Sequence, residues 1–318
     1  MPYLRNKTEH MDIQPITIAV LLTCHDRKAY TTACLCRLAE VTRHYNADAT
    51  HTPVAIAVYL TDDGCSDGTV EAAHDACQDI ELHIVKGDGS LFWAGGMRVA
   101  WREAMKESQR WQYYLLINDD TMMGDNLYTE LFAAEDYART VYGRTGICSG
   151  ITCDPTDGKK ITYGGDVFEG SMHGKTHRVS PTGTPQQVDI TNANILLVPQ
   201  SVVSEVGIFA DGYRHSCADH DYCMLVRRHG IPALVTAHVC GQCADDHTPE
   251  SDLSGRLATM TLAERRAWVR HPLHSDSDYL LYVWRNNRRK YIFSWALRKL
   301  RLYCPKLYCA ITKARGVY

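Results

Sequence analysis

The feature that most constrains the fold of this chain is an apolar run that occurs four times and ends each time in polar residues. The runs are Ile16–Leu22, Val54–Leu60, Leu82–Val85 and Tyr113–Ile117. Segments with helical character separate them: Ala29–Val41, a stretch from about Thr69, and Met97–Ser108. Alternation of strands and helices predicts a parallel α/β sheet, and continuous apolar runs are typical of strands buried on both faces. We therefore expect an α/β sheet flanked by helices.

The polar residues that follow the four runs predict a single binding edge. They are Thr23–Arg27, Asp62–Thr69, the Gly-rich stretch Lys86–Gly96, and Asn118–Thr121. In open α/β sheets, ligands bind outside the carboxyl ends of the strands. Each segment alone is an ordinary loop, but together they predict one polar rim.

The sharpest candidate in this rim is Asn118-Asp119-Asp120, directly after the fourth run. Side chains alternate along an extended chain, so Asn118 and Asp120 share one side and Asp119 faces the other. Adjacent carboxylates can bind a hard divalent cation and a hydroxyl together. The alternative is a simple turn, for which these residue types are also well suited.

Length and charge predict one large domain with an appendage. The 318 residues are 45% hydrophobic, enough for a substantial core. We expect a flexible N-terminus over residues 1–14, the main domain over 15–250, and a helical, basic extension over 251–318. Residues 285–318 hold ten Lys or Arg and no Asp or Glu, whereas the rest of the chain is acidic. Charge is therefore divided between an acidic body and a basic tail.

The sequence also predicts a cytoplasmic protein. Residues 1–14 are polar and lack the hydrophobic region of a signal peptide, and the apolar runs are too short to cross a bilayer. The thirteen scattered cysteines are interpreted as reduced thiols.

Four motifs carry a resemblance to a known family. Thr23-Cys24-His25-Asp26-Arg27 is similar to its opening nucleotide loop. Asp62–Thr69, which reads Asp-Asp-Gly-Cys-Ser-Asp-Gly-Thr, is close to its signature Asp-Asp-Gly-Ser-Thr-Asp-Gly-Thr. Gly89–Met97 resembles its third loop. Asn118-Asp119-Asp120 stands at its Asp-X-Asp metal motif, with Asn118 in place of the first acid. From Thr17 to Ile231 the chain thus resembles family 2 glycosyltransferases of the GT-A fold, such as bacterial polysaccharide and rhamnosyl transferases.

The resemblance implies a Rossmann-like mixed sheet flanked by helices, with a C-terminal helical extension, and it implies roles for the rim. Thr23 and Asp63 would hold the nucleotide base and ribose, and Trp93 would lie against the nucleotide sugar. Asp119 would hold the ribose or the sugar. Asp120 would bind Mg²⁺ or Mn²⁺, which neutralises charge on the departing nucleoside diphosphate.

The segment Tyr213–Gly230 resembles the family's Glu-Asp-X-Asp region. By that resemblance Asp219 is the general base that takes the proton from the acceptor hydroxyl, so that attack inverts the anomeric centre. His215 and Asp221 would orient the acceptor, and Asp221 has a neighbouring Arg as a second candidate partner. The alternative for Asp219 is structural, as the cap of a helix that ends near Gly230.

The segment from His238 to His247 includes Cys240 and Cys243 and leaves three interpretations open. The four side chains could bind zinc. His238 or His247 could instead complete the shell of the catalytic metal, as a His downstream of the base does in some family members. Ordinary loop packing is the third.

Beyond the fourth run, the pattern predicts a strand at Gly146–Thr152, a hairpin within Lys160–Phe168 and a further strand at Val188–Val198. Asp278–Tyr303 has an apolar stripe beside a basic one, with helical spacing. It predicts a helix that packs on the domain or docks on an anionic membrane surface. Nucleic acid is not expected as a partner, because the acidic body would repel it.

The predicted function is inverting, metal-dependent transfer of a hexosyl or deoxyhexosyl group from a UDP or dTDP sugar. The acceptor would be a hydroxyl of a glycan or a lipid-linked glycan in polysaccharide biosynthesis, at or near the inner face of the membrane. One alternative is a non-catalytic sugar-nucleotide-binding or assembly protein. The other is a sugar-nucleotide nucleotidyltransferase, which would need a Gly-rich, basic phosphate loop that Thr23–Arg27 does not provide.

Overall fold

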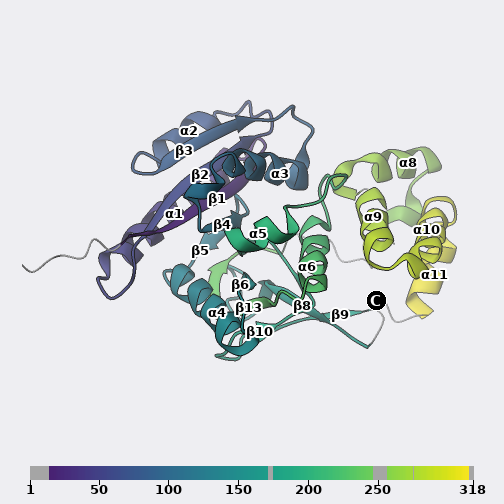
Figure 1. The fold of residues 1–318 in the computed structure, drawn as a ribbon. Helices are drawn as coiled ribbons and strands as arrows, with labels where there is room; N and C mark the ends of the chain where they lie inside the picture. The colour runs from purple at the N-terminus through teal and green to yellow at the C-terminus, as the bar shows by residue number, and fades with distance from the viewer. Residues whose placement is uncertain (1–13, 171–174, 246–255, 275, 315–318) are drawn as a thin grey trace, which may run out of the picture.

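A mixed sheet flanked by helices forms the centre of the protein (Figure 1). The computed structural model describes residues 14–170, 175–245, 256–274 and 276–314. The strands of the main sheet are β1 (Ile16–Cys24), β2 (Val54–Asp62), β3 (Glu81–Lys86), β4 (Tyr113–Ile117), β5 (Met122–Met123), β6 (Ile147–Cys153), β7 (Ile161–Tyr163), β10 (Gln186–Gln187), β12 (Ile195–Pro199) and β13 (Ala233–Gln242). A small second sheet contains β8 (Gly165–Phe168), β9 (Thr176–Arg178) and β11 (Ile190–Thr191).

The order of strands confirms the predicted α/β architecture. Along the main sheet the strands follow the order β10-β13-β6-β12-β4-β1-β2-β3; in addition, β5 pairs with β13 and β7 pairs with β6. Strands β3, β2, β1 and β4 are parallel, as the alternation predicts. β12 is antiparallel to both of its neighbours, β4 and β6, which makes the sheet mixed.

Helices cover both faces of this sheet. They are α1 (Lys28–Ala47), α2 (Thr69–Ala76), α3 (Phe92–Met105), α4 (Leu127–Tyr142), α5 (Gln200–Val206) and α6 (Ala218–Arg228). The C-terminal part of the chain forms α8 (Leu262–Arg270), α9 (Asp276–Asn286), α10 (Arg288–Tyr303) and α11 (Pro305–Ala314). Along β1, Ile18, Val20 and Leu22 pack into one core with α1, α2 and α4. Ala19 and Leu21 belong to a second core with α3, α5 and α6. The period of two places alternate side chains in different cores, so the apolar run stays buried throughout.

Three predicted elements differ from the structure. Lys160–Phe168 is not a hairpin, because β7 pairs with β6 while β8 pairs with β9 and β11. The predicted strand Val188–Val198 is divided into β11 and β12 by residues 192–194. Asp278–Tyr303 is interrupted at Asn287, where α9 ends and α10 begins in a new direction (Figure 1).

The C-terminal helices lie at one end of the molecule, next to α6 (Figure 1). α9 contacts α6, and α10 packs against α8, α9 and α11. Within the described part of the chain, no helix combines the length and the apolar character needed to cross a membrane. The predicted domain boundary at residue 250 falls among residues 246–255, outside the described residues.

Candidate active site at the carboxyl ends of the strands

The polar rim is present at the carboxyl edge of the parallel strands. Cys24 at the end of β1 pairs in register with Asp62 at the end of β2, and Leu21 of β1 pairs with Leu116 of β4. Because the strands are parallel and in register, the loops that follow them leave the sheet on the same edge. The loop bearing Asp119 therefore lies beside the other two.

Asp63 organises the loop between β3 and α3. Its Oδ1 accepts a hydrogen bond from the backbone N–H of Gly89 at 2.9 Å, and its Oδ2 accepts one from Phe92 at 3.0 Å. A Cβ atom at Gly87 would lie 2.6 Å from Asp63 Oδ1, so only glycine fits there. Each carboxylate oxygen has a further lone pair. The prediction that Asp63 also binds a nucleotide base stays compatible with these contacts.

Thr23 lies under the first turn of α3. A Cβ atom at Gly96 would overlap Thr23 Oγ1, so α3 comes this close to β1 only because residue 96 is glycine. Thr61 Oγ1, on β2, donates to the carbonyl of Gly96 at 2.8 Å. The Gly95-Gly96 pair is therefore part of a packed helix, which begins at Phe92 and not at the predicted Met97.

Asn118 and Trp93 are partners across the rim. The indole Nε1 of Trp93 donates to Asn118 Oδ1 at 2.7 Å, and the backbone N–H of Asn118 donates to the carbonyl of Asn194. An amide oxygen accepts this bond without adding a charge beside Asp119 and Asp120. Asn118, which stands in place of the first acid of the Asp-X-Asp motif, thus fixes the position of the Trp93 ring.

Arg27 binds both carboxylates of the motif. Its Nη2 lies 2.6 Å from Asp120 Oδ2 and its Nε lies 3.3 Å from Asp119 Oδ2. Asp119 also accepts a hydrogen bond from Thr31 Oγ1 at 3.1 Å and is only 7% exposed. Burial raises the pKa of Asp119 to about 6, and the charge of Asp120 adds to this although Arg27 opposes it. The site therefore pairs one buried carboxylate with a more accessible one.

The donor set suits a divalent metal. Asp119 and Asp120 supply hard oxygen atoms, which Mg²⁺ and Mn²⁺ prefer. A cationic group, the guanidinium of Arg27, already lies against both carboxylates. The two carboxylates therefore attract positive charge, and in this structure Arg27 supplies it.

Asp219 lies in the first turn of α6. The N-cap position belongs to Cys217, whose side chain makes no capping hydrogen bond. Asp219 Oδ2 instead accepts a hydrogen bond from the backbone N–H of Ala193 at 3.2 Å. The next residue, Asn194, bonds through its carbonyl to Asn118. One short segment, residues 192–194, thus connects the candidate base to the loop of Asp119 and Asp120.

Asp219 is therefore not the N-cap residue of α6, although its Oδ1 accepts a hydrogen bond from the backbone N–H of His220 in the same turn at 2.9 Å. Asn192 and Asn194 are polar residues within Val188–Val198, the stretch predicted as one strand. They mark the loop that interrupts it, and Asn192 Nδ2 lies 3.2 Å from His220 Nε2.

Asp221 faces away from Asp219, toward the C-terminal helices. It is almost fully buried, its Oδ2 accepts from Arg285 Nε at 2.8 Å, and its Oδ1 accepts from Asn286 Nδ2 at 2.7 Å. Of the two roles considered for Asp221, the structure favours an ion pair with a neighbouring Arg. The Arg belongs to α9, which is more than sixty residues further along the chain.

His215 belongs to a loop that one carboxylate holds. Asp278 Oδ2 on α9 accepts from the backbone N–H groups of Arg214, His215 and Ser216 at 3.2, 2.8 and 2.9 Å. Asp278 is fully buried. It was not identified from the sequence, because no local pattern connects a single Asp with a loop sixty residues earlier.

His238 lies against α4 and not beside Asp120. Its Nδ1 is 2.8 Å from Glu130 Oε1, and its backbone N–H donates to Glu130 Oε2. In this segment Cys243 is the residue next to the motif, with its Sγ 3.6 Å from Asp120 Oδ1. Assignment of His238 to the metal site therefore has no support from its position, and His247 lies outside the described residues.

The zinc interpretation is also unsupported in the part of the chain that the structure describes. There, the ligating side chains that gather within 4.8 Å of one another are Asp26, Cys65 and Asp67, in a different loop. All thirteen cysteines have free thiols in this structure. Cys240 is buried against Thr236, which is ordinary packing.

Backbone strain also marks this edge of the sheet. Among the described residues, the non-glycine residues with positive φ are Asp26 (48°), Phe92 (55°) and Cys217 (64°). They stand directly after β1, at the start of α3 and before α6. Such conformations cost free energy and often occur at functional sites. Here they direct three loops toward the rim.

Comparisons with known proteins agree with this architecture. No family model matches the chain, and no curated protein matches it by sequence. A structure of S. aureus TarS, residues 1–349, matches with a TM-score of 0.53 at 11% identity, over 91% of this chain and 75% of that one. A structure of GalNAc-T7 with UDP, GalNAc and Mn²⁺ matches with a TM-score of 0.51 at 12% identity, over 72% of this chain and 43% of that one. Both are glycosyltransferases of the GT-A fold. The mixed sheet, its flanking helices and these two likenesses show that the chain has the GT-A fold.

Proposed function

We propose that this protein is a metal-dependent, inverting glycosyltransferase that uses a nucleoside-diphosphate sugar. The observation that carries the proposal is the connection between Asp219 and the motif Asn118-Asp119-Asp120 through residues 192–194. A candidate proton acceptor and a candidate metal site thus meet at the edge where open α/β sheets bind ligands.

Each residue of the rim would contact a different part of the nucleotide-sugar donor. Thr23 and Asp63 would face the base and ribose, and Trp93 and Asp119 would face the ribose or sugar. Asp120 would hold Mg²⁺ or Mn²⁺, which would supply Lewis-acid assistance to the departing diphosphate. The structure of GalNAc-T7, which has the same fold, contains UDP and Mn²⁺. This likeness supports a divalent ion at the corresponding edge.

Asp219 would accept the proton of the attacking hydroxyl. Its carboxylate makes two backbone hydrogen bonds, to Ala193 and His220. A carboxylate has about four lone-pair directions, so an acceptor hydroxyl can still donate to it. The acceptor would approach along the loop that contains His215.

The motifs of the sequence also suggest a donor, an acceptor and a family. We propose a UDP or dTDP sugar of the hexose or deoxyhexose type, a glycan or lipid-linked acceptor, and membership of family 2 in polysaccharide biosynthesis. The protein would act in the cytoplasm, with peripheral contact to an anionic membrane through its basic C-terminal helices.

Calorimetry with UDP, dTDP and GDP, each with and without Mn²⁺, tests the proposal. The affinity for one nucleotide should increase when Mn²⁺ is present. Asp120→Ala should abolish this Mn²⁺-dependent gain in affinity. Asp125→Ala is the matched control, because it removes an exposed carboxylate that pairs with Arg37 instead. Equal affinity of wild type and Asp120→Ala in Mn²⁺ would exclude Asp120 as the metal ligand. Binding without transfer to any glycan acceptor would favour a non-catalytic binding protein.

A further inference from the structure

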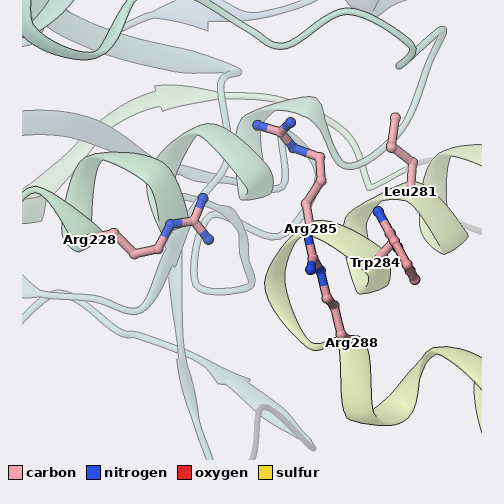
Figure 2. Close-up of a pocket in the computed structure, with 5 residues that line it drawn as sticks. All are labelled: Arg228, Leu281, Trp284, Arg285 and Arg288. Carbon is pink, nitrogen blue, oxygen red and sulfur yellow. The ribbon is translucent and has the colours of Figure 1, made fainter.

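A basic pocket lies between α6 and the corner where α9 meets α10 (Figure 2). It has a volume of about 370 Å³ and is lined by Arg228, Leu281, Trp284, Arg285 and Arg288. Figure 2 shows Arg228 extending from α6 toward the side chains of α9 and α10. Three guanidinium groups from three helices therefore surround one space.

The positive charge of this pocket exceeds its negative charge. Arg285 forms an ion pair with Asp221 at 2.8 Å. Arg228 Nη1 donates to the neutral Asn286 Oδ1 at 2.6 Å, and Arg288 lies 4.9 Å over the ring of Trp284. Among the described residues, Asp221 is the carboxylate at these three guanidinium groups, and it pairs with Arg285 alone. Arginine forks match the oxygen geometry of phosphate, so the surplus charge favours a phosphate group.

An exposed apolar surface continues from this pocket along α10. Arg288, Ile292, Trp295 and Lys299 are spaced by four, three and four residues, so they share one face of the helix. Ile292 is 77% exposed and Trp295 is 46% exposed. Lys299 Nζ lies 5.5 Å from the Trp295 ring. On a solvated helix the exposed face is polar, whereas here cationic and apolar side chains share it.

That combination is typical of helices that lie in a membrane interface. Tryptophan and aliphatic side chains enter the boundary between head groups and acyl chains, and basic side chains bind the anionic head groups. Each cation near an anionic surface adds to the attraction. Charge complementarity and continuity with the pocket therefore indicate a lipid surface as the occupant.

We propose that the pocket binds the phosphate of an anionic phospholipid while Ile292 and Trp295 enter the membrane interface. This assigns a defined lipid site to the membrane contact in the proposed function and rests on that part of it. It does not depend on sugar transfer, since membrane binding is measurable without donor or acceptor.

Co-sedimentation of the full chain with vesicles tests the proposal. One set of vesicles contains phosphatidylcholine alone, and the other contains equal parts of phosphatidylcholine and phosphatidylglycerol. The double substitution Arg228→Gln with Arg288→Gln should weaken binding to the anionic vesicles by about tenfold or more. The matched control, Arg43→Gln with Lys159→Gln, removes the same charge from exposed sites elsewhere and should change binding far less. Ile292→Ser with Trp295→Ser should also weaken it.

Several results would overturn the assignment. Equal loss in the pocket variant and the charge-matched control would mean that total charge, and not this pocket, determines binding. Equal sedimentation with both kinds of vesicle would exclude selection for anionic lipid. If wild type ignores the vesicles but inorganic phosphate raises its melting temperature, and the pocket variant does not respond, the pocket takes a soluble phosphate. Circular dichroism of each variant checks the fold. If the vesicle experiments give the expected results but the protein transfers no sugar, only the proposed function is contradicted.

Discussion

Arg27 Nη2 lies 2.6 Å from Asp120 Oδ2, so a side chain of the first loop occupies the carboxylate that is proposed to bind metal. The same guanidinium reaches Asp119 with its Nε. Metal binding and this ion pair use the same negative charge. A divalent ion must therefore displace Arg27 or share the carboxylates with it.

Arg27→Gln should consequently raise the affinity of the nucleotide-free protein for Mn²⁺. A half-exposed ion pair is worth about 1 kcal/mol, so we expect a gain of a few-fold to about tenfold. Titration of Mn²⁺ by electron paramagnetic resonance measures it. Arg102→Gln is the control, because it breaks a surface ion pair with Asp211. An unchanged or weaker Mn²⁺ affinity in Arg27→Gln would contradict competition for one site.

The raised pKa of Asp119 predicts how stability depends on pH in the metal-free protein. Its pKa is about 6 in the fold against 3.8 for the ordinary group, so the folded state binds the extra proton between these values. The contribution of Asp119 to the free energy of unfolding is therefore most favourable below pH 4, and it is lost as the pH rises through 6. Relative to Asp119→Asn, wild type should lose about 3 kcal/mol of unfolding free energy across this window.

Urea unfolding in EDTA at pH values from 4 to 8 checks this difference. The comparison with Asp119→Asn cancels the other titrating groups. Parallel pH profiles of the two proteins would show that Asp119 has an ordinary pKa in the fold.

Asp219→Asn separates catalysis from donor binding. The amide has nearly the same size, and its oxygen can still accept one of the two hydrogen bonds, from Ala193 or from His220. It is too weak a base to take a proton. Sugar transfer should fall by about 10²- to 10⁴-fold, while donor affinity stays within a few-fold. Transfer rates and calorimetry on the same preparation provide both values. A parallel loss of donor binding and transfer would give Asp219 a structural role instead.

Asp278→Ala should destabilise the loop that contains His215. The substitution leaves the part-buried N–H groups of residues 214–216 without their acceptor, and each lost hydrogen bond to this charged group costs free energy. We expect a loss of about 2–4 kcal/mol in unfolding free energy. Asp136→Ala, an exposed carboxylate on α4, should cost far less. If Asp278→Ala melts at the wild-type temperature, α9 does not hold this loop.

Much of the fold was predictable because short, local stretches of the sequence determine its strands. The apolar runs that became β1, β2 and β4 are continuous, β3 is apolar apart from His83, and polar residues end each one. The start of α3 was missed because Gly95-Gly96 is typical of a loop. Its helical role depends on the approach of Thr23 from another strand, which no local pattern reveals. The break at Asn287 was missed for a similar reason, since apolar spacing continues across it.

The candidate site was predictable in part. Asp119, Asp120 and Asp219 were identified from short motifs, and the structure brings their loops together. Arg27 was named only as the end of a loop, because its contact with Asp119 spans ninety residues. His238 was misplaced because spacing along a strand does not show which neighbouring helix it faces. Partners that are distant in sequence, such as Asp221 and Arg285, need the tertiary structure.

The contact between Trp93 and Asn118 has an optical consequence. The indole of Trp93 donates to Asn118 beside the two aspartates, so changes in this loop alter the surroundings of a fluorescent side chain. The chain has six tryptophans, and subtraction of the spectrum of Trp93→Phe isolates the emission of this one. The protein therefore contains an intrinsic fluorophore at its rim, through which ligand arrival can be followed in real time without a label.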